Sequence, residues 1–197
     1  MAARKTILSI ISFFFIITFV FSGDKVQAAP PGEKYKRTIE NYVVPDVTLV
    51  NQNGAKIKLR SLLSSKKVVL IDFIFTTCTT ICPVLSAGFS NFQKKIGTDS
   101  ENVHLVSISI DPENDTPKKM KAYLQRYKAK PGWDFLTGNP NDIKKVLGAL
   151  KASTADNKMY HLPLAILHSS NAKQWVRIYG LIGTSDLIAE YRKVLGQ

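Results

Sequence analysis

The sequence contains only two cysteines, Cys78 and Cys82, so a scaffold stapled by several disulfides is excluded. A disulfide between these two residues would close a very short loop, and such a loop constrains the unfolded chain only slightly. Stability is therefore a poor reason for the pair, and chemistry is a better one.

A long apolar run is also lacking. The stretch Ile7–Phe21 has 15 residues, fewer than the roughly 20 that a transmembrane helix needs. It follows Arg4 and Lys5 and precedes small residues at a cleavage site, so we predict a secretory signal peptide over residues 1–28. An uncleaved anchor is the alternative, and no cysteine follows the run to serve as a lipoprotein anchor. Either way, we expect the domain in the periplasm or on the outer face of the cytoplasmic membrane.

Acidic residues are scarce: 15 Asp and Glu face 27 Lys and Arg, which gives a net charge of +12. This charge favours an acidic partner or association with an anionic membrane surface, although a basic solvated surface is the simpler explanation. The basic residues are scattered and the chain is predicted to be exported, which argues against a nucleic-acid partner. An apolar fraction of 45% with 21% charged residues excludes a disordered chain and a multispanning membrane protein.

Hydrophobic patterning predicts one mixed α/β domain over residues 43–197, preceded by a linker over residues 29–42. An N-terminal β-hairpin is expected at residues 47–59, around an Asn-Gly turn. The apolar run Val68–Phe75 is typical of a central strand that is buried on both faces. The other expected strands are 103–110, 135–136, 164–167 and 175–178, and the expected helices are 84–96, one opening at Thr116-Pro117, 141–150 and 185–195. The result is a mixed sheet with helices on both faces.

The two cysteines follow the central strand, at the start of the next helix. A thiol at a helix N-terminus meets unpaired N–H groups and the positive end of the helix dipole, which favour the thiolate. Thiolates attack disulfides and also bind soft metals. Three residues separate Cys78 from Cys82, whereas thioredoxin-type enzymes typically have two. A separation of four positions places both sulfurs on one face of a helical turn, which suits a metal clamp that can also be oxidised.

Among the three histidines, His161 is the candidate third ligand. If the strand 164–167 runs antiparallel to the cysteine strand, its start lies beside the cysteine loop and His168 lies at its far end. His104, near the start of another strand, is expected to be half-exposed and structural. Two thiolates and an imidazole suit Cu(I), or Cu(II) with one added ligand, and zinc would also accept them.

Two segments resemble the signatures of the Sco/SenC copper chaperones. They are Phe75-Thr76-Thr77-Cys78-Thr79-Thr80-Ile81-Cys82-Pro83 and Ser107-Ile108-Ser109-Ile110-Asp111-Pro112-Glu113-Asn114-Asp115-Thr116-Pro117. His161 matches the family's third copper ligand by position. The resemblance implies a thioredoxin-like fold with copper bound by Cys78, Cys82 and His161. It also implies delivery of copper to, or redox preparation of, the binuclear copper site of cytochrome c oxidase.

Three further residues are candidates for supporting roles. Asp72 lies in the buried strand six positions before Cys78, where a carboxyl group can relay a proton to a thiol or form structural hydrogen bonds. Asp111 lines the site or forms a turn before Pro112. Pro163 is a candidate cis-proline facing the cysteine loop.

Three functions remain open on these residues. The first is a metallochaperone, which is not an enzyme, transferring copper to the copper-bearing subunit of the oxidase or to another exported copper protein. The second is a thiol–disulfide oxidoreductase in which Cys78 attacks and Cys82 resolves. The third is a copper or redox sensor that signals to a membrane partner. His161 distinguishes the first two, because disulfide exchange does not need it.

Overall fold

Strand β4 (Val68–Ile74) forms the centre of the sheet, and all seven of its residues are buried. The computed structural model describes residues 35–153, 162–170 and 175–196. Within them, eight strands form one sheet in the order β1-β8-β7-β4-β5-β6-β2-β3. The other strands are β1 (Lys36–Glu40), β2 (Thr48–Asn51), β3 (Lys56–Lys58), β5 (Val103–Ser109), β6 (Trp133–Thr137), β7 (Leu164–His168) and β8 (Trp175–Tyr179).

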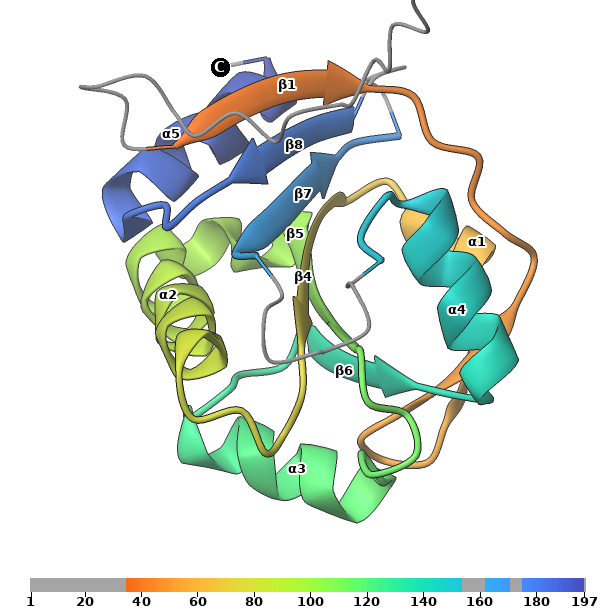
Figure 1. The fold of residues 1–197 in the computed structure, drawn as a ribbon. Coiled ribbons are helices and arrows are strands. Elements are labelled where there is room, and N and C mark those ends of the chain that lie inside the picture. Colours follow the sequence, from red (N-terminus) through yellow and green to blue (C-terminus); the bar gives the residue numbers. More distant parts are fainter. Residues whose placement is uncertain (1–34, 154–161, 171–174, 197) are drawn as a thin grey trace, which may run out of the picture.

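Helices cover both faces of this sheet. Helices α2 (Ile81–Ile96) and α5 (Thr184–Leu195) lie on one face, and α1 (Leu59–Leu63) and α4 (Pro140–Ala149) lie on the other (Figure 1). Helix α3 (Pro117–Arg126) packs beside α2, where the Tyr123 and Ser86 hydroxyls hydrogen-bond at 2.9 Å. The mixed sheet with helices on both faces that the sequence predicts is therefore confirmed.

Strands β4, β5 and β6 are parallel, and the remaining pairs are antiparallel. Strands β4 and β5 pair in parallel and are connected through α2, which makes a strand–helix–strand unit. The carboxyl ends of parallel strands meet at one edge of a sheet, where ligand sites gather in α/β folds. The cysteines follow β4 at this edge, which is called the cysteine end below.

The predicted hairpin is present as β2 and β3, and the Asn51 side chain holds its turn. Its Oδ1 accepts hydrogen bonds from the backbone N–H groups of Asn53 and Ala55, both at 3.0 Å. Gly54 has φ +78°, a left-handed conformation that glycine adopts without steric cost. The hairpin lies at the sheet edge beyond β6.

The linker predicted over residues 29–42 is wrong for its second half. Residues Lys36–Glu40 form strand β1, which pairs antiparallel with β8 and extends the sheet. The segment alternates half-buried and exposed positions, and its charged residues hide this alternation. Arg37 pairs at 2.7 Å with Glu190 of α5, so the charges themselves fasten the strand. The predicted signal peptide lies outside the described residues.

Within the described ranges, no helix is long and apolar enough to cross a membrane.

Candidate metal and redox site

The cysteine loop, residues 75–82, begins where β4 ends. The Cys78 N–H donates to the Phe75 carbonyl at 3.2 Å and closes a tight turn, and α2 begins at Ile81. Cys78 therefore stands just before the helix, and Cys82 lies in its first turn. The prediction that both cysteines share one helical turn is wrong for Cys78, because the turn after Phe75 keeps that residue out of the helix.

The Cys78 sulfur acts as the cap of α2. The Cys82 N–H, one of the unpaired donors of the first helical turn, points to Cys78 Sγ at 3.4 Å. Thr80 occupies the N-cap position but provides no side-chain capping hydrogen bond. Its hydroxyl lies 3.7 Å from the Cys78 sulfur instead. A sulfur thus replaces the oxygen that normally caps a helix, and it accepts better as a thiolate.

This geometry separates the two thiols electrostatically. Burial by itself raises the pKa of the Cys78 thiol, but hydrogen bonds from Cys82 and Thr80 outweigh burial, so the pKa of Cys78 is lowered. Burial raises the pKa of the Cys82 thiol strongly, and the hydrogen bond to Cys78 raises it further. Cys78 is therefore the thiol that ionises first. This agrees with the role of attacking thiol that the sequence suggests for it.

No disulfide joins the two cysteines, and both are nearly inaccessible to solvent, with 6% of Cys78 and 0% of Cys82 exposed. Two soft sulfur donors at one helix N-terminus fit a thiophilic metal such as copper. The described residues hold no cluster of three or more His, Cys, Asp or Glu side chains suited to a metal. His161, the predicted third ligand, lies outside the described residues.

Strand β7 runs antiparallel to β4, as the interpretation of His161 required. Asp72 pairs with Ala165 and Val69 pairs with His168, so β7 starts at the cysteine end and finishes at the opposite end. His168 is far from the cysteines along the strand, and its ring stacks on Trp175 with centroids 3.8 Å apart. The prediction that His168 is not a ligand candidate is consistent with this position.

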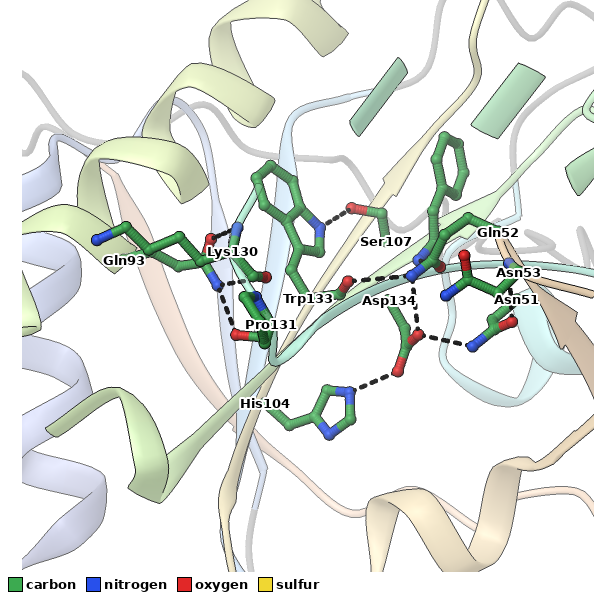
Figure 2. Close-up of polar contacts among 11 residues, drawn as sticks. Asn51, Gln52, Asn53, Gln93, His104, Ser107, Lys130, Pro131, Trp133 and Asp134 are labelled. Carbon is green, nitrogen blue, oxygen red and sulfur yellow. Dashed lines mark hydrogen bonds and ion pairs between the residues drawn. The ribbon is translucent and has the colours of Figure 1, made fainter. Parts of the chain in front are cut away.

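His104 belongs to a structural network at the opposite end of the sheet. Its Nε2 lies 2.8 Å from Asp134 Oδ2, and Asp134 Oδ1 accepts from the Asn51 amide at 2.9 Å and the Gln52 amide at 3.2 Å (Figure 2). This network, called the Asp134 network below, joins the hairpin to β5 and β6. His104 is half-buried and structural, as predicted.

Asp72 is fully buried in β4, and neither of its carboxyl oxygens has a well-formed hydrogen bond within the described chain. Burial raises the pKa of Asp72 to about 7, and the Ser107 hydroxyl on β5 offsets only part of this rise. The electrostatic influence of Asp72 extends to Cys82, whose pKa it raises.

Asp111 and Pro163 have simpler surroundings. Asp111 accepts from the Asn114 amide at 2.9 Å, and its carbonyl accepts from the N–H groups of Asn114 and Asp115, which are the contacts of a turn. Pro163 accepts from the Gly180 N–H at 3.0 Å. No cis peptide bond occurs among the described residues, so the predicted cis-proline at Pro163 is wrong.

Asp115 also belongs to the site, although it is not among the residues predicted from the sequence. Its carboxylate accepts hydrogen bonds from both the N–H and the hydroxyl of Thr76, within the cysteine loop. One signal was available, because parallel strands bring the loops after β4 and β5 together at one edge. An acid four residues after Asp111 was thus a candidate to meet the cysteine loop.

Residues 36–193 match the family model described as SCO1/SenC. The SCO1 protein homolog of Bacillus subtilis is 39% identical over 133 residues, which cover 66% of this chain and 67% of that protein. The matched region spans about half of two other relatives, 49% of a SCO2-like protein of Rickettsia typhi and 51% of a Stutzerimonas stutzeri protein named for copper binding.

Solved structures of Sco proteins are also similar to this chain. BsSco, a member of the Sco family of cytochrome c oxidase assembly proteins studied for a disulfide switch, is 32% identical with a TM-score of 0.66. The alignment covers 78% of this chain and 94% of BsSco. Copper-bound ScoI of Bradyrhizobium japonicum is 29% identical with a TM-score of 0.62, over 75% of this chain and 96% of that one.

Proposed function

The chain belongs to the SCO1/SenC family, and we propose that it is a copper-binding metallochaperone with thiol redox capability. Its cargo is a copper ion held by Cys78, Cys82 and His161. The recipient is the binuclear copper site of cytochrome c oxidase or another exported copper protein. Copper-bound ScoI and the oxidase-assembly role of BsSco support this assignment by similarity.

The observation that carries the proposal is the position of the Cys78 sulfur over the N-terminus of α2. The Cys82 N–H donates to this sulfur, so one ligand is pre-oriented beside the other. The lowered pKa of Cys78 favours its thiolate, whereas the raised pKa of Cys82 keeps that thiol protonated until metal replaces its proton. The site therefore releases a proton when copper binds.

His161 completes the ligand set in this proposal. The antiparallel strand β7 starts three residues after it, at the cysteine end of the sheet. A soft set of two thiolates and one imidazole favours copper over hard cations such as Mg²⁺. Transfer then proceeds by exchange of these ligands for the recipient's own cysteines. We place this exchange outside the cytoplasmic membrane, as the segment 1–28 predicts.

A second function, thiol–disulfide exchange, is favoured by the unequal pKa values of the two cysteines. The Cys78 thiolate attacks an acceptor disulfide and releases one acceptor thiolate, which leaves a mixed disulfide. Cys82 then loses its proton and attacks Cys78 Sγ, which releases the second acceptor thiolate. The acceptor gains two electrons and Cys78–Cys82 becomes a disulfide. The Asp72 carboxylate, with a pKa of about 7, is suited to take the Cys82 proton.

Copper binding by the reduced domain tests the proposal. Purified protein from residue 30 onward, with His161→Ala and His168→Ala variants, is titrated separately with Cu(I), Cu(II) and Zn²⁺. We expect one tight copper per chain and thiolate-to-copper absorption, both weakened by His161→Ala. His168→Ala is the matched control and should bind as wild type, because His168 pairs at the far end of β7. Absence of tight copper binding, together with rapid oxidation of the cysteine pair by glutathione disulfide, would contradict the metallochaperone and support the thiol–disulfide oxidoreductase.

A further inference from the structure

Asp115 is a buried acid whose hydrogen bonds converge on the cysteine loop. Only 1% of its surface is exposed. Its Oδ1 accepts from the Thr76 N–H at 3.1 Å and from the Thr76 hydroxyl at 2.5 Å, and its Oδ2 accepts from the Ser109 hydroxyl at 2.6 Å. Removal of a carboxylate so placed leaves three donors without their acceptor, one on the buried Ser109 and two on the partly buried Thr76.

These bonds connect two segments that are far apart in sequence. Thr76 lies two residues before Cys78, and Asp115 lies between β5 and α3. The Ile110 N–H also donates to the Ile74 carbonyl at 3.1 Å, so the parallel pairing continues up to the loop. Beyond the end of β4, hydrogen bonds to Asp115 replace the backbone hydrogen bonds between the strands. They fix the path of the chain from β4 to Cys78.

We propose that Asp115 is the positioning residue of the cysteine loop. By holding Thr76 at both its N–H and its hydroxyl, the carboxylate sets the turn that places the Cys78 sulfur over the N-terminus of α2. It touches neither sulfur in the described contacts, so its action on Cys78 passes through Thr76. The reactivity of the pair thus depends on an acid 37 positions after Cys78.

The physical link is the geometry of the hydrogen bonds on sulfur. The Cys82 N–H and the Thr80 hydroxyl reach Cys78 Sγ at 3.4 and 3.7 Å, already long for hydrogen bonds. A small displacement of the turn at Thr76 weakens both bonds. Those bonds belong to the dithiol state, so their loss shifts the dithiol–disulfide equilibrium toward the disulfide.

The experiment measures that equilibrium against glutathione, in which one glutathione disulfide becomes two glutathione thiols as Cys78 and Cys82 form a disulfide. Four variants are compared with wild type: Asp115→Asn, Thr76→Val, Thr76→Ser and Asp134→Asn. Asp134→Asn is the matched control. The Asp134 carboxylate also accepts hydrogen bonds from three donor groups, but it lies at the opposite end of the sheet from the cysteines. Urea unfolding of each dithiol protein reports stability separately.

We expect Asp115→Asn to favour the disulfide by about tenfold, the size of change that loss of the hydrogen bonds on the Cys78 sulfur from the dithiol state produces. Thr76→Val keeps the N–H bond and should give a smaller shift in the same direction. Thr76→Ser restores the hydroxyl and should match wild type. Asp134→Asn should lower stability and leave the equilibrium unchanged.

Two results would overturn the inference: an equal shift in Asp115→Asn and Asp134→Asn, or no shift in Asp115→Asn. If Asp115→Asn does not fold, the pair Thr76→Val and Thr76→Ser decides, and equal behaviour of those two variants overturns it. The inference deepens the proposed function, because the loop matters only if the pair is functional. The glutathione equilibrium contains no copper, so failure of copper binding and failure of this inference are distinguishable.

Discussion

Asp72 and Asp134 occupy opposite situations in one sheet. Asp134, at the start of β6, is 18% exposed and accepts hydrogen bonds from three side chains (Figure 2). Asp72, near the cysteine end of β4, is fully buried and has no well-formed hydrogen bond within the described chain. The acid that joins the hairpin to the sheet has three donors, whereas burial dominates the surroundings of the acid near the cysteines. Stability is gained at one end, and a costly group is kept at the other.

The two acids should therefore affect stability with opposite dependence on pH. Burial raises the pKa of Asp72, so the folded protein binds the proton more tightly than the unfolded chain, and its contribution to stability falls as pH rises from about 4 to 7. Burial alone would also raise the pKa of Asp134, but the bonds from His104, Asn51 and Gln52 lower it. Its contribution is therefore present above about pH 4 and is lost as pH falls below that value.

The largest effect on stability is expected from Asp72→Asn. A rise in pKa from 3.8 to about 7 corresponds to a cost of burying the charged form on the order of 4 kcal/mol above pH 7. The variant removes this cost, so its advantage over wild type should grow as pH rises from 4 to 8. Urea unfolding at four pH values in that range measures this trend.

The decisive quantity for Asp72→Asn is the slope with pH rather than the absolute stability, because the new amide is itself buried. A difference between variant and wild type that is constant from pH 4 to 8 would show that Asp72 does not titrate in this range. It would then also lose its assigned part in removing the Cys82 proton.

An intermediate effect is expected from Asp134→Asn. The amide keeps one acceptor oxygen but cannot serve all three donors, so the free energy of unfolding should fall by about 1–3 kcal/mol at pH 7. The deficit should shrink as pH falls below about 4, because Asp134 then takes up a proton in the unfolded chain while its lowered pKa keeps the folded acid charged. Thermal or urea unfolding at pH 7 and pH 3 checks both parts. A deficit as large at pH 3 as at pH 7 would mean that the shape of the side chain, not its charge, makes the network stable.

The sequence predicted the elements whose signal is local. The apolar run of β4, the Asn-Gly turn of the hairpin and the Thr116-Pro117 start of α3 are all read from neighbouring residues, and the structure has each of them. Strand β1 was missed because its pairing partner β8 is more than 130 residues away. No local pattern reports such a partner.

The sequence predicted the reactive residues of the site, but not the residues that hold them in position. Cysteines after a buried strand indicate a helix N-terminus, and the register of β7 followed from one assumption about its direction. Parallel pairing brings the loops after β4 and β5 to the same edge of the sheet. The specific contact of Asp115 with Thr76 depends on the conformations of both loops, which the residue pattern does not encode. The conformation of Pro163 was not predictable for the same reason, since tertiary contacts select the isomer.

The smallest effect is expected from Thr116→Ala, and it separates Asp115 from its neighbour in sequence. The Thr116 side chain caps α3 by accepting from the Lys119 N–H at 3.4 Å, a long bond, so its loss should cost about 1 kcal/mol of unfolding free energy. The cap does not reach the cysteine loop in the described contacts. The glutathione equilibrium and the copper affinity should therefore match wild type while urea unfolding shows the loss. If Thr116→Ala instead shifts the equilibrium as far as Asp115→Asn does, the cysteines respond to any loosening between β5 and α3. The specific link from the Asp115 carboxylate through Thr76 to Cys78 would then be wrong.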